Sequence, residues 1–500
     1  MCTRSQLLSV VTVLLIAGSV LHAQTFEGFL DVSVPTGAAT SLTTEDGGST
    51  LSSGIGSLGT DGTEVLPAGF ALIRYRPNGV LISETSVPMT RITHFGRIYV
   101  EVGGAVNTGV AIANPTANPV TINFSFMDTS GAIVKTGTTQ LLPFARVTRF
   151  VNEAPFSLKG DFIGTLTITA SGPPVSIIAI RGFTNERSEF LISNVPVIQT
   201  DFGGEDSFLP HFANGYGWTT QVVLVNSSDQ PVSGTFQFLN NENVTGDDQP
   251  IEIVVNGQSD SSFAYLIPPG SAQTFLTNGE PEDEQVGSIR LIQSPGSSLP
   301  LGYVILSFRQ DGVTVTQDSF VGAPRPTVHR MYVEEDLSQG IQTGIGILNP
   351  GTDNISIIFN VTDLNGQPTG LSGTIPMDAF GHSSKFLREI PGLETLPQSF
   401  KGVVQIVTAY RIGASLVGLR TRLNERGELL ISSNSPVPEQ FDPTDPSILV
   451  ANPHIVNGAG YTTELVFFSP ASVGAPAPTG GVFNFFAETA NAIEFTPPLQ

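Results

Sequence analysis

The chain has 500 residues, with 22 Lys and Arg against 44 Asp and Glu, which gives a formal net charge of −22. Such an acidic surface disfavours nucleic acid and anionic membranes as partners, because both are themselves negatively charged. The 53 Gly, 36 Pro and 40% hydrophobic residues are typical of a chain of many short strands and turns.

The first residues are typical of an export signal. Arg4 supplies a positive start, residues 7–20 form an apolar stretch, and Ala23 offers a small residue for cleavage. The stretch is shorter than the roughly 20 apolar residues of a membrane span, so we expect residues 1–23 to be removed; an uncleaved anchor is the alternative. The only cysteine is Cys2, so the mature chain is expected to contain neither a disulfide nor a cysteine metal ligand.

Internal repetition dominates the rest of the sequence. Residues 97–101 (RIYVE) return as residues 330–334 (RMYVE), and residues 210–220 (PHFANGYGWTT) return as residues 453–463 (PHIVNGAGYTT). Alternating apolar residues and short apolar runs, separated by Asn-Gly and Asp-Gly turns, predict strands joined by tight hairpins. We interpret the repeats as copies of one ancestral unit of about 115 residues.

Two subtypes of this unit, A and B, alternate along the chain. The predicted order is the second half of a type B unit at 24–93, type A at 94–200, type B at 201–326, type A at 327–438, and a linker with the first half of type B at 439–500. Roughly seven or eight short strands per unit predict an immunoglobulin-like β-sandwich, so the expected fold class is all-β with tandem sandwiches. A large β-propeller is the alternative, because two four-stranded blades would also fill such a unit.

The two terminal halves add up to one type B unit. Residues 66–70 (LPAGF) align with residues 299–303 (LPLGY). Half a sandwich would expose an apolar face and unpaired strand edges. We therefore expect residues 24–93 to complete the core begun by residues 446–500 of the same chain, because intramolecular closure has the higher effective concentration. The alternatives are strand exchange between chains, which would give oligomers, and a fragment whose matching ends are coincidental.

No residue is assigned a catalytic, cofactor-binding or metal-binding role. His211 and His454 lie in a repeated phrase without other ligands at metal-site spacing, so we interpret them, like the other histidines of the mature chain, as structural. No serine lies in a Gly-x-Ser-x-Gly elbow on a strand-to-helix turn, and the protein is predicted not to be an enzyme. Loose calcium binding by the acidic loops Asn240–Asp248 and Glu280–Glu284 is considered, although polar hairpin loops explain both. Trp218, the only tryptophan, has Tyr461 as its counterpart, which indicates packing rather than a sugar platform.

Two repeat phrases carry a family resemblance. Residues 108–115 (TGVAIANP) and 217–226 (GWTTQVVLVN) resemble those of exported bacterial proteins with tandem immunoglobulin-like β-sandwich repeats, which mostly have no assigned activity. The resemblance implies a secreted, non-enzymatic protein that acts as a binding, adhesive or structural module at or beyond the cell surface, with an unidentified extracellular protein or glycan as partner. The alternative is an accessory carbohydrate-binding module of an extracellular polymer-degrading system, which predicts aromatic and carboxylate side chains in one groove.

Overall fold

The computed structural model of the protein covers most of the predicted mature chain. It describes residues 25–44, 48–199, 208–239, 250–322, 325–409, 413–440, 442–445, 447–472, 474–475, 477–487 and 495–496. The predicted export signal at 1–23 lies outside the described residues, and so does the loop Asn240–Asp248 that was considered for calcium.

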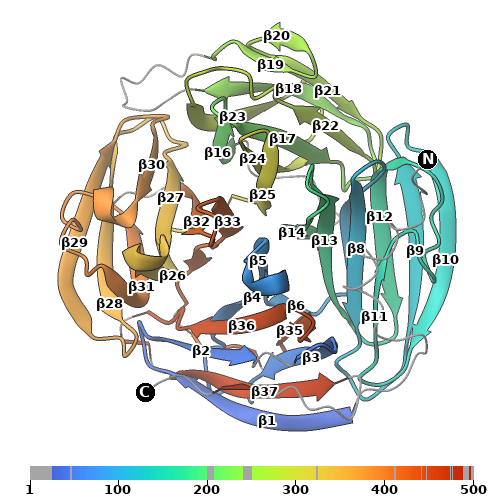
Figure 1. Ribbon diagram of the computed structural model, residues 1–500, viewed down its shortest axis with the longest axis horizontal. Coiled ribbons are helices and arrows are strands. Elements are labelled where there is room, and N and C mark those ends of the chain that lie inside the picture. The colour runs from blue at the N-terminus through green and yellow to red at the C-terminus, as the bar shows by residue number, and fades with distance from the viewer. Residues whose placement is uncertain are drawn as a thin grey trace.

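Four antiparallel β-sandwiches are arranged in a closed ring (Figure 1). In each unit two sheets lie face to face and bury one apolar core between them, as is typical of sandwiches. The prediction of an all-β fold built from tandem β-sandwiches is therefore confirmed. Sheets of neighbouring units also stack face to face, as where Phe70 and Phe468 of the fourth sandwich pack with Tyr332 of the second type A unit, so the propeller alternative, which predicts sheets stacked around a central axis, is not excluded by this arrangement.

The two type A units share one topology, in which a five-stranded sheet covers a four-stranded sheet. The first unit has the strand orders β10(Ile133–Leu141), β9(Val120–Asp128), β12(Phe162–Ser171), β7(Phe95–Val102), β15(Val197–Ile198) and β11(Arg146–Phe150), β8(Val106–Ala113), β13(Ser176–Thr184), β14(Phe190–Val195). The second has β29(Pro368–Met377), β28(Ile355–Asp363), β31(Ser399–Thr408), β26(Val328–Asp336), β34(Val437–Pro438) and β30(His382–Phe386), β27(Gln342–Leu348), β32(Ser415–Leu423), β33(Leu429–Ser433), with the short 3-10 helices η2(Leu337–Gln339) and η3(Leu387–Glu389).

The type B unit between them has two four-stranded sheets and a small hairpin. The strand orders are β16(Phe208–Asn214), β23(Gln285–Gln293), β18(Val232–Leu239), β21(Phe263–Ile267) and β22(Ala272–Leu276), β17(Trp218–Val225), β24(Leu301–Gln310), β25(Val313–Phe320), and the hairpin is β19(Ile253–Val255) with β20(Gln258–Asp260).

The fourth sandwich is built from both ends of the chain. Its sheets have the orders β1(Thr25–Val34), β37(Thr479–Ala487), β3(Ser52–Gly59), β35(Leu449–Asn457), β6(Thr90–Arg91) and β38(Phe495–Thr496), β2(Ala39–Thr44), β36(Tyr461–Phe468), β4(Ala68–Tyr75), β5(Ser83–Pro88), with the 3-10 helix η1(Pro77–Gly79) between β4 and β5. N-terminal and C-terminal strands alternate in both sheets, so the predicted pairing of the terminal halves is confirmed. We call this sandwich the composite unit.

Side-chain periodicity explains why these segments form sandwich strands. Along β9, Val120, Ile122, Phe124 and Phe126 are buried, while the residues between them are half-buried. Successive side chains of a strand point to opposite faces of its sheet, so this period-two pattern turns one face of β9 toward the core. In the composite unit the corresponding core is shared between the termini, with Leu58 packed in the same cluster as C-terminal phenylalanines such as Phe483.

Four strands, one from each unit, surround the axis of the ring. These axial strands, β5, β14, β25 and β33, contact one another in the order of the units (Figure 1). They belong to four different sheets, so side chains connect them. The hydroxyl of Ser83 in β5 accepts a hydrogen bond from the amide of Ile192 in β14 at 2.9 Å, and the hydroxyl of Thr316 in β25 accepts one from the amide of Ile431 in β33 at 3.0 Å.

Candidate functional site

A cavity of about 490 Å³ opens where the axial strands end. All four units contribute to its wall, which includes the ends of β5, β14, β25 and β33 and the segments that follow them. The lining residues are Leu66–Phe70, Ser86, Pro88–Arg91, Ile177, Ile178, Asn194–Val197, Ser319, Val321, Gly322, Ser433, Ser435–Pro438, Gln440, Thr444, Ile448, Val450, Phe468 and Pro470. The cavity thus exists only when the ring is closed.

The wall of the axial cavity is apolar and rigid, with neutral polar groups at its floor. Ser86, Ser319 and Ser433, toward the ends of three axial strands, line the cavity and are buried, and we call these three residues its floor. Six of the lining residues are prolines, whose fixed φ angle restricts the backbone. A preformed wall spares a ligand part of the entropic cost of ordering its site.

Asp318 lies beside the floor of the cavity and connects three axial strands. Its carboxylate accepts hydrogen bonds from the hydroxyl of Thr85 at 3.1 Å, the amide of Asn194 at 3.2 Å and the amide of Ser433 at 2.5 Å. Burial raises the pKa of Asp318 to about 7, although the hydrogen bonds from the two amides oppose the shift. Asp318 therefore changes its charge near neutral pH at the point where the units meet.

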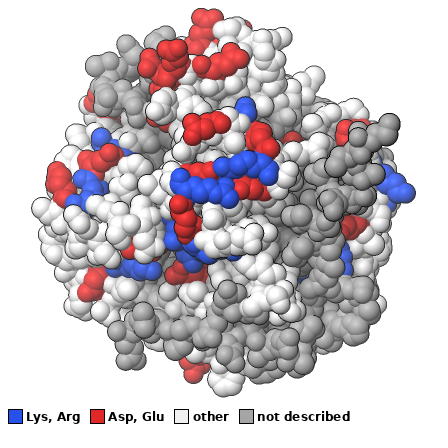
Figure 2. Space-filling model, in the orientation of Figure 1, with Lys and Arg blue, Asp and Glu red and all other residues white. Residues whose placement is uncertain are grey.

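The opposite end of the axis is closed by two hairpin turns, residues 185–189 and 424–428, one from each type A unit. Across the axis, Arg187 pairs with Glu428 at 2.5 Å, and Arg426 pairs with Glu189 at 2.6 Å. This reciprocal pairing follows from the repeat, because the two turns occupy equivalent positions in the type A units. Figure 2 shows basic and acidic side chains gathered over the centre of one face of the ring. We call these two turns the charged plug.

Each turn of the charged plug also contacts a neighbouring unit at or just before the start of its axial strand. Glu186 accepts a hydrogen bond from the amide of Thr314 at 2.8 Å, and Glu425 accepts one from the amide of Leu81 at 2.8 Å. The axial strands therefore all start at the plug and end at the cavity, which makes the cavity a pocket open at one end of the axis.

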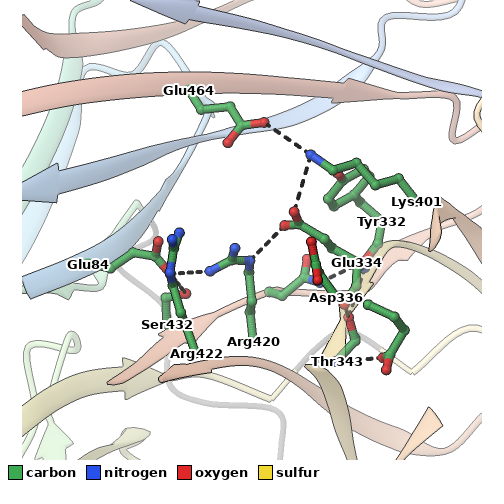
Figure 3. Close-up of polar contacts among 12 residues, drawn as sticks. Glu84, Tyr332, Glu334, Asp336, Thr343, Lys401, Arg420, Arg422, Ser432 and Glu464 are labelled. Carbon is green, nitrogen blue, oxygen red and sulfur yellow. Dashed lines mark hydrogen bonds and ion pairs between the residues drawn. The ribbon is translucent and has the colours of Figure 1, made fainter. Parts of the chain in front are cut away.

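A cyclic network of charges joins the second type A unit to the composite unit. Three carboxylates and three cations alternate around the cycle, and each contacts both of its neighbours. In order they are Glu84, Arg420, Glu334, Lys401, Glu464 and Arg74. Figure 3 shows Arg420 reaching Glu84 and Glu334, while Lys401 bridges Glu334 and Glu464.

The cycle is compact and mostly buried. Nε of Arg420 lies 2.9 Å from Oε2 of Glu334, and Nη2 of Arg74 lies 2.7 Å from Oε2 of Glu464. Burial raises the pKa of Glu334, but Arg420 and Lys401 outweigh it and lower the pKa to about 2. The balance is the same for Glu84, where Arg420 and Arg74 outweigh burial and lower the pKa. The carboxylates therefore stay ionised at neutral pH, and the network acts as an ionic clasp between two units.

Three of the histidines, His211, His382 and His454, lie at contacts between units. Nδ1 of His211 is 3.5 Å from Nε2 of His382, with the rings stacked and their centroids 5.6 Å apart. Burial lowers the pKa of His211 to about 4, and burial together with His211 lowers that of His382 to about 3. At the equivalent contact His454 faces Arg146 at 3.5 Å, and burial and that cation lower its pKa to about 3. Sequence spacing did not indicate the pairing, because His211 and His382 are 171 residues apart.

The remaining candidates from the sequence occupy loops and packed positions. Within the described part of the chain, no three His, Cys, Asp or Glu side chains gather as metal ligands would. In the loop Glu280–Glu284, Glu280 accepts a hydrogen bond from Asn278 at 2.9 Å. Trp218 packs against Phe308 with ring centroids 4.6 Å apart. None of the described helices has the length and apolar character needed to cross a membrane.

Sequence reasoning did not identify the cavity residues or Asp318. The only available signal was that both type A repeats end in similar segments, Val195–Val197 and Ser435–Val437, which turn out to line the cavity. Repetition alone did not show that these segments converge, since convergence is a property of the closed ring.

Comparisons with known proteins add no function. No protein-family model matches the chain. No curated protein matches it either. Among solved structures, the VP2 subviral particle of infectious bursal disease virus aligns over 80% of this chain and 81% of that chain, at 8% identity and a TM-score of 0.12. The Gt strain of the same virus aligns over 98% of this chain and 90% of that chain, at 9% identity and a TM-score of 0.12. TM-scores this low carry no argument about this chain.

Proposed function

We propose that the protein is a secreted, non-enzymatic binding module that holds a small, largely apolar ligand in the axial cavity. The main support for this proposal is that four units converge on one cavity of about 490 Å³. Ligand sites are typically concave, mainly apolar and about 300–1,000 Å³ in volume, with a few polar groups that orient the ligand. The apolar wall and polar floor of the axial cavity match this description.

The composition of the wall favours binding over catalysis. The lining residues of the cavity include no Asp, Glu, His, Lys or Cys among the described residues. General acid–base and covalent catalysis most often use side chains of these types, placed within reach of the substrate. The proposal places the protein outside the cell, on the predicted export signal at 1–23.

A ligand screen with a blocked variant tests this proposal. Val321 lines the cavity and is 44% exposed, so Val321→Trp narrows the cavity without disturbing a core. The control is Ile133→Trp, which adds the same side chain at a 60% exposed position on β10. We expect ligands found by thermal shift to bind the native protein and the control but not Val321→Trp. Equal binding by all three proteins would reject the cavity as the site.

A carbohydrate-binding accessory module is the second candidate, and one exposed aromatic residue favours it. Tyr216 is 72% exposed in a tight turn, and its amide donates to the carbonyl of Pro281, within the acidic loop Glu280–Glu284. The equivalent turn of the composite unit carries Ala459, so the fold does not require an aromatic residue there. A glycan array probed with the native protein and Tyr216→Ala tests this candidate; loss of a glycan signal only in the variant would support it.

A further inference from the structure

Arg91 is the only charged residue that lines the axial cavity among the described residues. It lies on β6, whose backbone pairs with β35, and its carbonyl accepts a hydrogen bond from Nε2 of Gln199 at 3.2 Å. The backbone of Arg91 is thus fixed at the edge of the composite unit. Its side chain is exposed, whereas Ser86 and Ser433 are buried at the floor, so the guanidinium lies toward the mouth.

The guanidinium of Arg91 has no hydrogen bond or ion pair within the described part of the chain. Other arginines near the axis are paired, as Arg187 is with Glu428 and Arg420 is with Glu334. In a chain with twice as many acidic as basic residues, an unpaired arginine at the mouth of an apolar cavity is available to a ligand. The planar guanidinium is suited to bidentate binding of a carboxylate.

The net charge of −22 does not oppose such a ligand at close range. Charges exposed to solvent are largely screened beyond about 8 Å at physiological ionic strength. The groups that decide the local potential are therefore Arg91, the only charge among the described lining residues, and Asp318 behind the floor, whose negative charge burial suppresses by raising its pKa to about 7.

We propose that the axial cavity binds an amphiphilic carboxylate, with its apolar chain inside the cavity and its carboxylate paired to Arg91. This inference rests on the proposed function and specifies its ligand class. The apolar wall, which includes Phe70, Val195 and Phe468, takes the chain, and burial of each methylene group contributes about 0.8 kcal/mol. Arg91 then distinguishes an anionic amphiphile from a neutral or cationic one.

Calorimetric titration of the full chain with three probes of equal chain length tests the proposal: octanoate, 1-octanol and octylammonium. We expect octanoate to bind at least about tenfold more tightly than the other two, since a charge-assisted bidentate pair provides that margin. Arg91→Gln should remove the preference and leave 1-octanol binding unchanged, while Arg91→Lys should retain part of it. The control is Lys159→Gln, which removes an exposed positive charge from the first type A unit, away from the cavity.

The outcomes separate the ligand class from the site. If the three probes bind equally to the native protein and to Arg91→Gln, but not to Val321→Trp, the anion preference is wrong and the cavity remains a binding site. If octanoate binds equally to Val321→Trp and the native protein, both proposals fail. If no probe binds the native protein, the amphiphilic carboxylate is rejected, and the ligand screen above decides on the cavity.

Discussion

Gln317 and Glu84 occupy equivalent positions on axial strands, yet one is neutral and the other belongs to the cyclic charge network. Gln317 accepts a hydrogen bond from Arg181 at the contact between the first type A unit and the type B unit. Glu84 pairs with Arg420, the counterpart of Arg181, at the contact that closes the ring. On the neighbouring strand of the same sheet, the residue that pairs with Gln317 is Ser307, whereas the residue that pairs with Glu84 is Arg74. Among the described residues, the fully ionic cycle is thus found where the composite unit meets the second type A unit.

Neutralising Glu84 should destabilise the ring strongly. Glu84→Gln leaves Arg420 and Arg74 buried with one partner fewer, and breaking a buried ion pair typically costs about 3–5 kcal/mol. Urea unfolding monitored by fluorescence measures the loss. Glu282→Gln, at an exposed loop position, serves as the control and should change stability by less than about 0.5 kcal/mol. Equal stability of the two variants would contradict the structural role of the cycle.

Asp318 should make stability fall as the pH rises toward neutrality. Burial raises the pKa of Asp318 from its ordinary value of 3.8 to about 7 in the folded protein, so folding favours the protonated form. The contribution of Asp318 is fully present below pH 4 and is lost as the pH rises through 7, which amounts to about 4 kcal/mol. Urea unfolding at a series of pH values should show this slope in the native protein and its absence in Asp318→Asn. Parallel pH profiles would show that Asp318 is ionised at lower pH than inferred.

The buried histidines should act in the opposite direction. Burial and the neighbouring His211 lower the pKa of His382 from its ordinary value of 6.5 to about 3. Stability from His382 is therefore present above pH 6.5 and is lost as the pH falls below it, by about 2 kcal/mol at pH 5. His382→Gln should weaken the loss of stability between pH 6.5 and 5, while His94→Gln, at an exposed position, should not. If both variants keep the native slope, His382 does not titrate in this range.

A charge reversal at Arg187 in the charged plug should lower stability, and a second reversal at its partner Glu428 should restore it. Arg187→Glu places two carboxylates together, and because both side chains are partly exposed the expected loss is about 1 kcal/mol. Arg187→Glu with Glu428→Arg restores the pair in reverse and should recover most of this loss. A double-mutant cycle at low and high salt measures the coupling, which should shrink in high salt. Additive effects of the two changes would mean that the pair contributes nothing.

The way in which the composite unit is assembled from one chain predicts that the protein is a monomer. Because β37 lies between β1 and β3 of the same chain, the composite unit needs no second chain to supply these strands. Sedimentation of the mature chain should give one mass across a hundredfold dilution, as intramolecular closure requires. A mass that grows with concentration would instead support strand exchange between chains.

The sequence alone determined the repeat, the strand-rich class and the pairing of the ends. Those features depend on local or self-similar patterns: the alternation in Val120–Asp128, the Asn-Gly turns, and the match of residues 66–70 with 299–303. Side-chain period and turn chemistry act over a few residues, so they can be read without the fold.

Only the tertiary structure decided what the ring brings together. Arg91, Asn194, Ser319 and Ser433 come from four units and line one cavity, and Glu84 meets Arg420 across 336 residues of sequence. Repetition fixes each unit but not the angle at which neighbouring units pack, and that angle places the axial strands around one axis. The cavity, the plug and the charge cycle exist because the composite unit closes the ring, which is a long-range property of packing rather than of any segment.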